Sequence, residues 1–199
     1  MQWGLAGVEL SERGSICARA PCGDRGEFSL GISLVHEGES IWLSTAGACP
    51  VSRKSTSLRP AGWAVTIAGT SAHGDHRDDV FGPVVTPTVA RERPGLAALY
   101  LGADLNGEEA ARIVAVVEAL LWIPAAVGGE SPLFPHLRNV ELQTPSSYVA
   151  GILTGAYVGD GYGALTETAR AAWDAARALL PRRRRASSTC PRSRARTPR

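Results

Sequence analysis

The chain has 199 residues, of which 44% are hydrophobic and 20% charged, so it is long enough for one domain with extensions and too apolar to be disordered throughout. Its formal net charge of +2 is unevenly distributed. Residues 182–199 contain eight arginines and no acid, which leaves 13 basic and 19 acidic residues, a net charge of −6, in residues 1–181. An acidic body with a basic tail argues against a nucleic-acid-binding fold, because such a fold carries its basic residues on ordered surface.

Residues 1–26 are expected to form an irregular extension. They begin without the basic residues and apolar core of a signal peptide, so we expect no export signal here. Cys17 and Cys22 are separated by four residues and could form a local disulfide, share a metal or remain reduced. A zinc site would need a second Cys or His pair at short spacing, which Cys49 and Cys190 do not supply, so a disulfide or free thiols are favoured.

The segment from residue 27 to residue 102 has the alternating or branched apolar pattern of strands. Prolines within residues 80–89 favour an edge strand there, and the continuous apolar run 96–101 favours a buried one. Strands are expected over residues 28–35, 40–45, 62–69, 80–89 and 96–101, with a turn at 36–39 and polar loops at 50–61 and 70–79.

The apolar period then changes to that of a helix. Asn106 is a candidate N-cap with Glu109 as its reciprocal acid, and apolar residues at helical spacing predict a helix over 107–123 that ends at Pro124. The apolar stretch 113–127 is interrupted by Glu118 and Pro124 and is shorter than the roughly 20 residues of a membrane-spanning helix, so we expect no span.

The C-terminal third is expected to contain a strand and two helices. Residues 139–143 alternate like a strand, and Thr144-Pro145 could cap a short helix through Leu153. Residues 166–180 predict a second long helix that Pro181 closes. The arginine-rich residues 182–199 are of low complexity and are expected to form a solvated, disordered tail, with contact to nucleic acid or an acidic membrane as the alternative.

The polar loop expected after the third strand contains a possible metal site. Its sequence SAHGDH, residues 71–76, resembles the second half of the His-x-His-x-Asp-His loop of metallo-β-lactamase-fold hydrolases, with Ser71 in place of the first histidine. His73, Asp75 and His76 could hold a divalent metal that activates a water, with His36 or His136 as a further ligand. A polar surface loop without metal is the favoured alternative.

A glycine-rich stretch, residues 155–163, does not predict a nucleotide site. No Gly-Lys-Ser/Thr follows it, and no βαβ frame surrounds it, so both the P-loop and the dinucleotide fingerprint fail. We expect no cofactor.

Several segments in order resemble trypsin-like serine proteases. Residues 42–49, WLSTAGAC, are similar to the family's Trp-Val-Leu-Thr-Ala-Gly followed by the catalytic His and a Cys. Residues 95–101, GLAALYL, are similar to the segment that begins with the catalytic Asp, and residues 159–165, GDGYGAL, to Gly-Asp-Ser-Gly-Gly-Pro-Leu. Residues 30–35, 63–68 and 135–142 resemble further strands of that fold.

The catalytic residues that this resemblance would require are missing. A serine nucleophile needs an imidazole to take its proton and a carboxylate to orient that imidazole. The matching positions are Ala48, Gly95 and Gly161, and none of these residues can act as base, orienting acid or nucleophile. The resemblance therefore implies a serine protease homologue that is inactive.

The resemblance implies a mainly β fold, a trypsin-like double β-barrel with an incomplete second barrel and helices at about 107–123 and 166–180; an α+β fold is the alternative. We divide the chain into an extension (1–26), the trypsin-like domain (27–165), a C-terminal helix (166–181) and the tail (182–199). The resemblance also implies secretion and a protein or peptide ligand in the former substrate cleft.

Two enzymatic alternatives remain open. One is the metal-dependent hydrolase built on His73, Asp75 and His76. The other is an active serine hydrolase whose nucleophile is Ser146 or Ser147, at a helix start that can stabilise negative charge, with His136 upstream as the base. Serines at such positions are more often helix caps.

Overall fold

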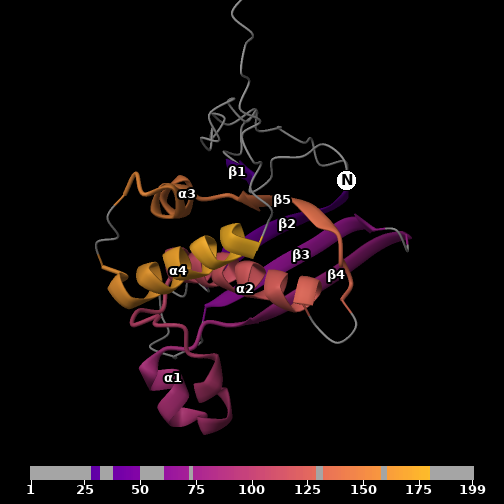
Figure 1. The fold of residues 1–199 in the computed structure, drawn as a ribbon. Coiled ribbons are helices and arrows are strands. Elements are labelled where there is room, and N and C mark those ends of the chain that lie inside the picture. Colours follow the sequence, from indigo (N-terminus) through magenta and orange to yellow (C-terminus); the bar gives the residue numbers. More distant parts are fainter. Residues whose placement is uncertain are drawn as a thin grey trace, which may run out of the picture.

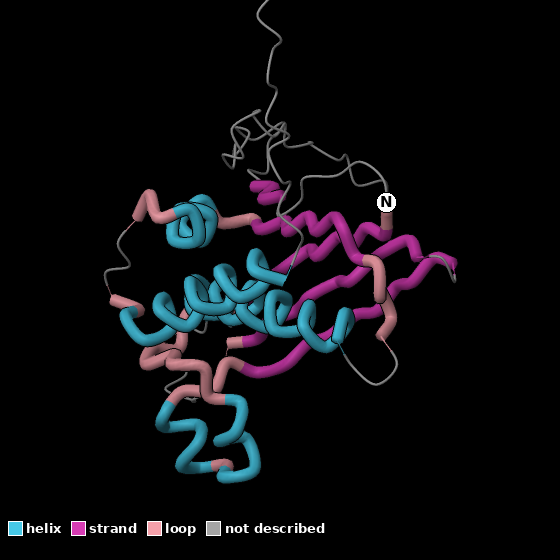
Figure 2. The backbone as a smooth tube through the Cα atoms, viewed as in Figure 1, coloured by secondary structure: helices cyan, strands magenta, loops and turns pink. Residues whose placement is uncertain are grey.

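A computed structural model describes residues 28–31, 38–49, 61–71, 74–128, 132–157 and 161–179. These residues form a mixed α and β fold in which one five-stranded sheet carries helices on its face (Figures 1 and 2). Residues 1–27 and 180–199 lie outside the described residues, and so do the expectations for Cys17, Cys22, Cys190, His36, His73 and the arginine-rich tail.

The sheet combines an antiparallel meander with one parallel pair. β2, β3 and β4 follow one another as antiparallel neighbours, and β5 then returns beside β2, parallel to it, and pairs with β1 on its other side. The strand order is β1-β5-β2-β3-β4. The strands are β1 (Phe28–Gly31), β2 (Glu39–Ala48), β3 (Gly62–Ser71), β4 (Gly74–Pro83) and β5 (Leu137–Thr144).

The long connection from β4 to β5 contains the central helix of the fold. α2 packs on β2 and β3, and α4 packs in turn on α2 and α3. Figure 1 shows α2 and α4 lying across the sheet, while α1 and the following 3-10 helix form a separate lobe below it. The helices are α1 (Pro87–Glu92), the 3-10 helix η1 (Pro94–Leu99), α2 (Glu108–Gly128), α3 (Ser147–Thr154) and α4 (Gly163–Leu179).

The core lies between the sheet and α2. Alternate residues of the three middle strands point toward α2 and are almost fully buried, as expected for strands with one covered face. On α2, apolar residues at helical spacing meet them. The main buried side chains at this contact are Ile41, Leu43, Val65, Ile67, Val140, Leu142, Ile113, Val116, Val117 and Leu120.

The fold differs from the expected double barrel. The described strands form a single sheet whose outer strands, β1 and β4, each pair with one neighbour only, so these strands do not close into a barrel. Strands and helices are both prominent, and the description "mainly β" does not fit the described residues. The α+β alternative agrees with this arrangement at the level of class.

Three local expectations about the segment after β3 are wrong. Residues 74–79, expected in a loop, form the edge strand β4 together with residues 80–83, and the register with β3 begins at the Ser71–Gly74 pair. The expected strand at 80–89 ends at Pro83, and α1 follows because Thr86 caps Val89 N and a proline occupies the first turn. The expected buried strand at 96–101 is mostly the 3-10 helix η1, which has no buried residue.

The downstream helices and strand lie where they were expected, but the first helix does not end at Pro124 as expected. The helix expected at 107–123 is α2, which continues past Pro124 to Gly128, and the helix expected at 166–180 is α4. The Asn106 carboxamide accepts a hydrogen bond from Ala61 N at 2.6 Å. The strand expected at 139–143 is β5, and the short helix is α3, whose N-cap is Ser146 and not the expected Thr144-Pro145.

α2 is long and apolar enough to cross a membrane by length and composition, contrary to the expectation from the 113–127 stretch. In the structure the helix lies between the sheet and α4, with most of its apolar side chains buried. The central helix of a folded core has the same composition as a span, so this property is weak evidence for a membrane segment.

Candidate functional site

The three positions that match the protease triad lie on separate elements. Ala48 ends β2, Gly95 is in η1, and Gly161 precedes α4. Among the described helices and strands η1 packs only on α1, so Gly95 is not placed against β2 or α4. Cys49, which follows Ala48, is a half-buried free thiol. In the described part of the chain, the three positions that match the triad therefore carry no serine, histidine or aspartate and are not brought together.

Asp75 and His76 lie on β4, and they point to opposite faces of the sheet because they are adjacent in a strand. Asp75 is opposite Thr70 in the register, and its carboxylate accepts a hydrogen bond of 3.2 Å from the Thr70 hydroxyl. His76 is opposite Gly69 on the side of the sheet that α2 covers. The two side chains are thus not placed to share one metal ion.

The His76 ring belongs to an aromatic cluster. Its centroid lies 6.5 Å from that of Trp122 in a stacked arrangement and 5.8 Å from that of Phe134, edge to face. The Nε2 atom of His76 is buried without a hydrogen-bond partner among the described residues. Within those residues no group of three or more His, Cys, Asp or Glu side chains is arranged to hold a metal. His73 is not among them.

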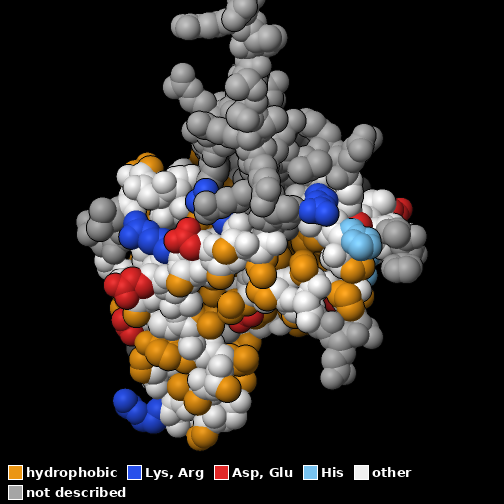
Figure 3. Space-filling view, viewed as in Figure 1, with side chains coloured by type: hydrophobic (Ala, Val, Ile, Leu, Met, Phe, Trp, Pro, Cys, Tyr) orange, Lys and Arg blue, Asp and Glu red, His pale blue; other side chains and the backbone are white. Residues whose placement is uncertain are grey.

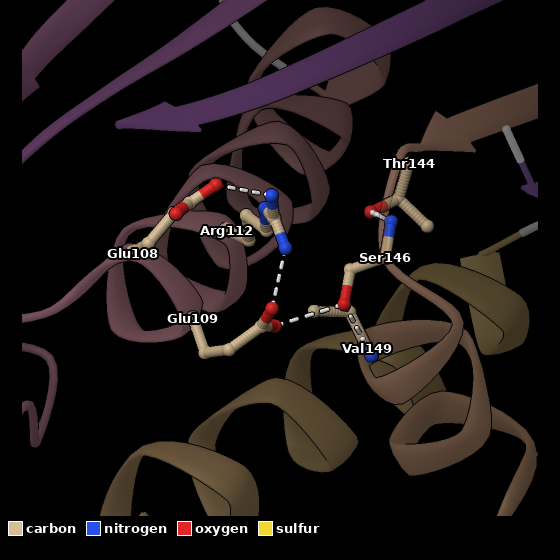
Figure 4. Close-up of polar contacts among 6 residues, drawn as sticks. All are labelled: Glu108, Glu109, Arg112, Thr144, Ser146 and Val149. Carbon is tan, nitrogen blue, oxygen red and sulfur yellow. Dashed lines mark hydrogen bonds and ion pairs between the residues drawn. The ribbon is translucent and has the colours of Figure 1, made fainter. Parts of the chain in front are cut away.

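Ser146 is the N-cap of α3 (Figure 4). Its Oγ accepts a hydrogen bond from Val149 N at 3.3 Å and donates one of 2.9 Å to Glu109 Oε2 at the start of α2. The other carboxylate oxygen of Glu109 accepts from Arg112, which also binds Glu108. Ser146 is only 4% exposed, and its hydroxyl joins the first turns of α3 and α2.

His136 is not placed to activate Ser146. His136 directly precedes β5 and Ser146 follows its other end, so the nine residues between them span roughly 30 Å of mostly extended chain. The His136 side chain is exposed, and its backbone N–H donates to Glu39 Oε2 at 2.7 Å. Ser147 is the exposed first residue of α3. The structure thus does not bring the residues of the serine-hydrolase alternative together.

A cavity of about 210 Å³ lies between α2 and the β3–β4 edge of the sheet. Two indole rings, of Trp63 from β3 and Trp122 from α2, contribute to its wall, and Glu118 is the one ionisable side chain among the described residues that line it. We call this cavity the indole pocket. Its lining residues are Trp63, Val65, Ile67, Val80, Glu118, Ala119, Leu121 and Trp122.

The Trp63 wall of the indole pocket is held by β4. Gly82 lies opposite Trp63 in the register, and a Cβ atom at Gly82 would lie 2.9 Å from Trp63 Cζ2, so the glycine leaves room for the indole ring over the neighbouring strand. The indole Nε1 donates a hydrogen bond of 3.2 Å to the carbonyl of Pro83. The ring is therefore fixed at both its face and its edge.

Glu118 gives the indole pocket its polarity. The carboxyl is half-buried on α2, and this burial raises its pKa above the ordinary value because the charged form loses water. Among the described residues no lysine, arginine or histidine forms an ion pair with Glu118. The pocket thus combines aromatic and aliphatic walls with one partly desolvated carboxyl.

The surface around α2 is apolar. On the face seen in Figure 3, hydrophobic side chains gather over α2 and over the lobe of α1 and η1, whereas the described arginine side chains lie toward the periphery. The largest exposed apolar side chains include Leu121, which lines the indole pocket, and Leu99 in the lobe.

The indole pocket was not predicted from the sequence. One signal for it was present, because Glu118 is an acid within the apolar stretch 113–127 of a helix that is otherwise buried. The position of Trp63 gave no such signal, since nothing local in the sequence specifies that α2 packs on β3 beside it.

Comparison with protein-family models, with curated proteins and with solved structures finds no match for this chain.

Proposed function

We propose that this protein is a non-catalytic binding protein that receives its ligand in the indole pocket. The observation that carries the proposal is the pocket itself, a concave site with a predominantly apolar wall and a single carboxyl, which is the usual composition of small-ligand sites. Among the described residues that line it, none is a serine, cysteine, threonine or lysine that could act as a nucleophile.

The arrangement of the other candidate residues supports binding over acyl transfer. Ala48, Gly95 and Gly161 offer no reactive side chain, and Ser146 uses its hydroxyl to cap α3 and to bind Glu109. Ser146 donates its proton to a carboxylate, and no imidazole of the described residues lies beside it to act as the base that activates a nucleophile.

Descent from trypsin-like proteases stays a hypothesis and is not needed for this function. The double barrel that it implies would require strands of two closed antiparallel barrels, whereas the described strands form one sheet with a parallel pair, β2 and β5. The binding role that the sequence suggested is kept here, with the indole pocket in place of the former substrate cleft.

Two measurements test the proposal. Fluorophosphonate labelling beside active trypsin is expected to leave the folded protein unlabelled; stoichiometric label on a serine would overturn the non-catalytic assignment. In parallel, NMR titrations of the indole N–H signals with alkylureas, alkylguanidinium ions and alkylcarboxylates are expected to shift the signals of Trp63 and Trp122 with at least one class of probe. No response to any class would overturn the binding site.

A matched pair of variants links binding to the indole pocket. Val80 lines the pocket, whereas its neighbour Phe81 is 79% exposed and points to the other face of β4. Val80→Trp should fill the mouth of the pocket and remove the probe-induced shifts. Phe81→Trp adds an indole one residue away and should leave them unchanged.

A further inference from the structure

We infer that the indole pocket selects an organic cation, a guanidinium or alkylammonium group carried on an apolar stem. This inference rests on the proposed binding function and names the ligand class for that same pocket. It is drawn from the charge, the aromatic walls and the size of the site.

The charges around the indole pocket have one sign. Glu118 lines it from α2, and Asp78 lies on the same side of the sheet, because Asp78 is opposite Ile67 in the β3–β4 register and Ile67 lines the pocket. Among the described lining residues no lysine or arginine balances these carboxylates. His76, two residues from Asp78 on the same strand face, is the remaining titratable group there.

Arg77 and Asp79 belong to the opposite face of the sheet, because side chains alternate along β4. Arg77 therefore does not supply the missing positive charge to the indole pocket. A bound cation would supply it, whereas an anion would be repelled by the Glu118 carboxylate and a neutral ligand would leave that carboxylate without a charged partner.

The aromatic walls favour the same class of ligand. Indole is the ring that attracts cations most strongly through its face, and Trp63 and Trp122 bring two of them to one small site. Gly82 and the hydrogen bond to the Pro83 carbonyl hold the Trp63 ring in place, so the ring need not be ordered when the ligand arrives.

The desolvation of Glu118 gives a cation an additional advantage. Burial disfavours the charged carboxylate, as its raised pKa indicates, and a cation placed beside it restores the ionised form. The ligand and the ionised carboxylate therefore stabilise each other in a site where both are partly removed from water.

The volume limits how much of a ligand enters. At about 210 Å³ the pocket is smaller than the roughly 300–1,000 Å³ of sites that enclose drug-sized molecules. It suits a single charged group with a short stem, such as an arginine side chain or a small alkylguanidine.

The test compares a cation with its neutral isostere. Butylguanidinium and butylurea have the same stem and nearly the same planar head, and NMR titration of the Trp63 and Trp122 indole signals gives the dissociation constant of each. We expect butylguanidinium to bind about tenfold more tightly, the ratio that a partly desolvated cation–π and carboxylate contact provides. Equal affinities would overturn the cation inference while leaving the binding function in place.

Variants assign the preference to the pocket carboxyl. Glu118→Gln keeps the shape of the side chain and should bring the two affinities close together. Glu167→Gln removes one exposed carboxylate from α4, outside the pocket, and should keep the tenfold ratio. If the ratio of the two affinities were unchanged in Glu118→Gln, the cation inference would be overturned. If the unmodified protein bound none of the probes, the proposed function itself would be overturned.

A second pair of probes identifies the source of the cation. N-acetylarginine amide and N-acetylcitrulline amide present the same two heads on a peptide-like stem. Preferential binding of the arginine compound shows that the pocket accepts a protein side chain, and binding of butylguanidinium alone assigns it to a free small molecule. Binding of neither cation would contradict the inference.

Discussion

Ser146 and Glu109 connect the first turn of α3 to the first turn of α2, because the Ser146 Oγ donates a hydrogen bond of 2.9 Å to Glu109 Oε2 (Figure 4). The same Oγ accepts from Val149 N, and the Ser146 N–H donates to Thr144 Oγ1 at 3.4 Å. Both polar groups of this buried residue are thus used within the fold.

Ser146→Ala should destabilise the protein by about 1–2 kcal/mol, because it removes the N-cap of α3 and leaves a Glu109 oxygen without its donor. Urea unfolding followed by circular dichroism measures this loss. The control is Ser147→Ala at the adjacent exposed position, which should change stability by less than about 0.5 kcal/mol. A Ser146→Ala variant of unchanged stability would show that the hydroxyl has no structural role.

Gly47 is required for the close contact between β2 and α2. A Cβ atom at this position would lie 2.6 Å from the backbone carbon of Ala111, and closer still to the nitrogen of Arg112, so the helix backbone would have to move. We expect Gly47→Ala to lower the free energy of unfolding by about 1–3 kcal/mol, as overpacking does in other cores.

Gly62 provides the comparison for Gly47. It lies on the adjacent strand, opposite Ala48, and the nearest atom to an added Cβ is the Gly82 carbonyl oxygen at 3.8 Å. Gly62→Ala should therefore change the midpoint of urea unfolding little. Equal losses in the two variants would mean that contact with α2 does not explain the effect at Gly47.

The sequence predicted the elements whose apolar spacing reflects burial. α2 and α4 follow a helical period because each turns one stripe toward a neighbour, and β5 alternates because one of its faces meets the core. The end of α2 was less well predicted. Pro124 removes one hydrogen bond of the helix, but it is exposed in the last turn and the helix continues to Gly128.

Prediction from the sequence failed for elements whose side chains are mostly exposed, because such elements show no periodic spacing of apolar residues. β4 is an edge strand with mostly exposed side chains, so its polar residues 74–79 were expected to form a loop. The apolar run 96–101 was interpreted as a buried strand, yet Pro94 begins the 3-10 helix η1, whose side chains no other described element except α1 covers. The pairing of strands that are distant in the sequence was also not predicted, since nothing local specifies that β5 lies parallel to β2.

The candidate site was less predictable than the fold. The metal alternative placed Asp75 and His76 in a loop, where they could converge, and the strand separates them onto opposite faces. The indole pocket depends on Trp63 and Trp122, which are 59 positions apart in the sequence and meet only because α2 packs on β3.

His76 should tolerate replacement by an aromatic residue without a polar atom. Its Nε2 is buried and without a partner among the described residues, and its ring packs against Trp122 and Phe134. His76→Phe keeps the aromatic contact, and we expect it to raise the free energy of unfolding by about 1 kcal/mol. Thermal melts measure the change. A melt of the unmodified protein that rises with added Zn²⁺ and loses this response in His76→Phe would instead support the metal alternative.

Glu118 should make the stability of the protein fall as the pH rises. Burial raises the pKa of this carboxyl in the folded protein above its value of about 4.3 in an unfolded chain, so between the two values the folded protein binds more protons than the unfolded one. The contribution of the neutral carboxyl is fully present below the unfolded pKa and is lost as the pH rises through the folded pKa.

Glu118→Gln removes this dependence, because the amide stays neutral at every pH. The variant and the unmodified protein should have equal stability near pH 4, and the variant should be more stable at pH 7, by less than about 1 kcal/mol because solvent screens a half-exposed charge. Urea unfolding at both pH values measures the difference. Glu167 lies on the exposed face of α4, so the difference in stability between Glu167→Gln and the unmodified protein should not increase between pH 4 and pH 7. The opposite result would be a Glu118→Gln variant that loses stability relative to the unmodified protein as the pH rises from 4 to 7. It would mean that a positive group of the folded chain already stabilises the Glu118 carboxylate. The indole pocket would then not need a cationic ligand.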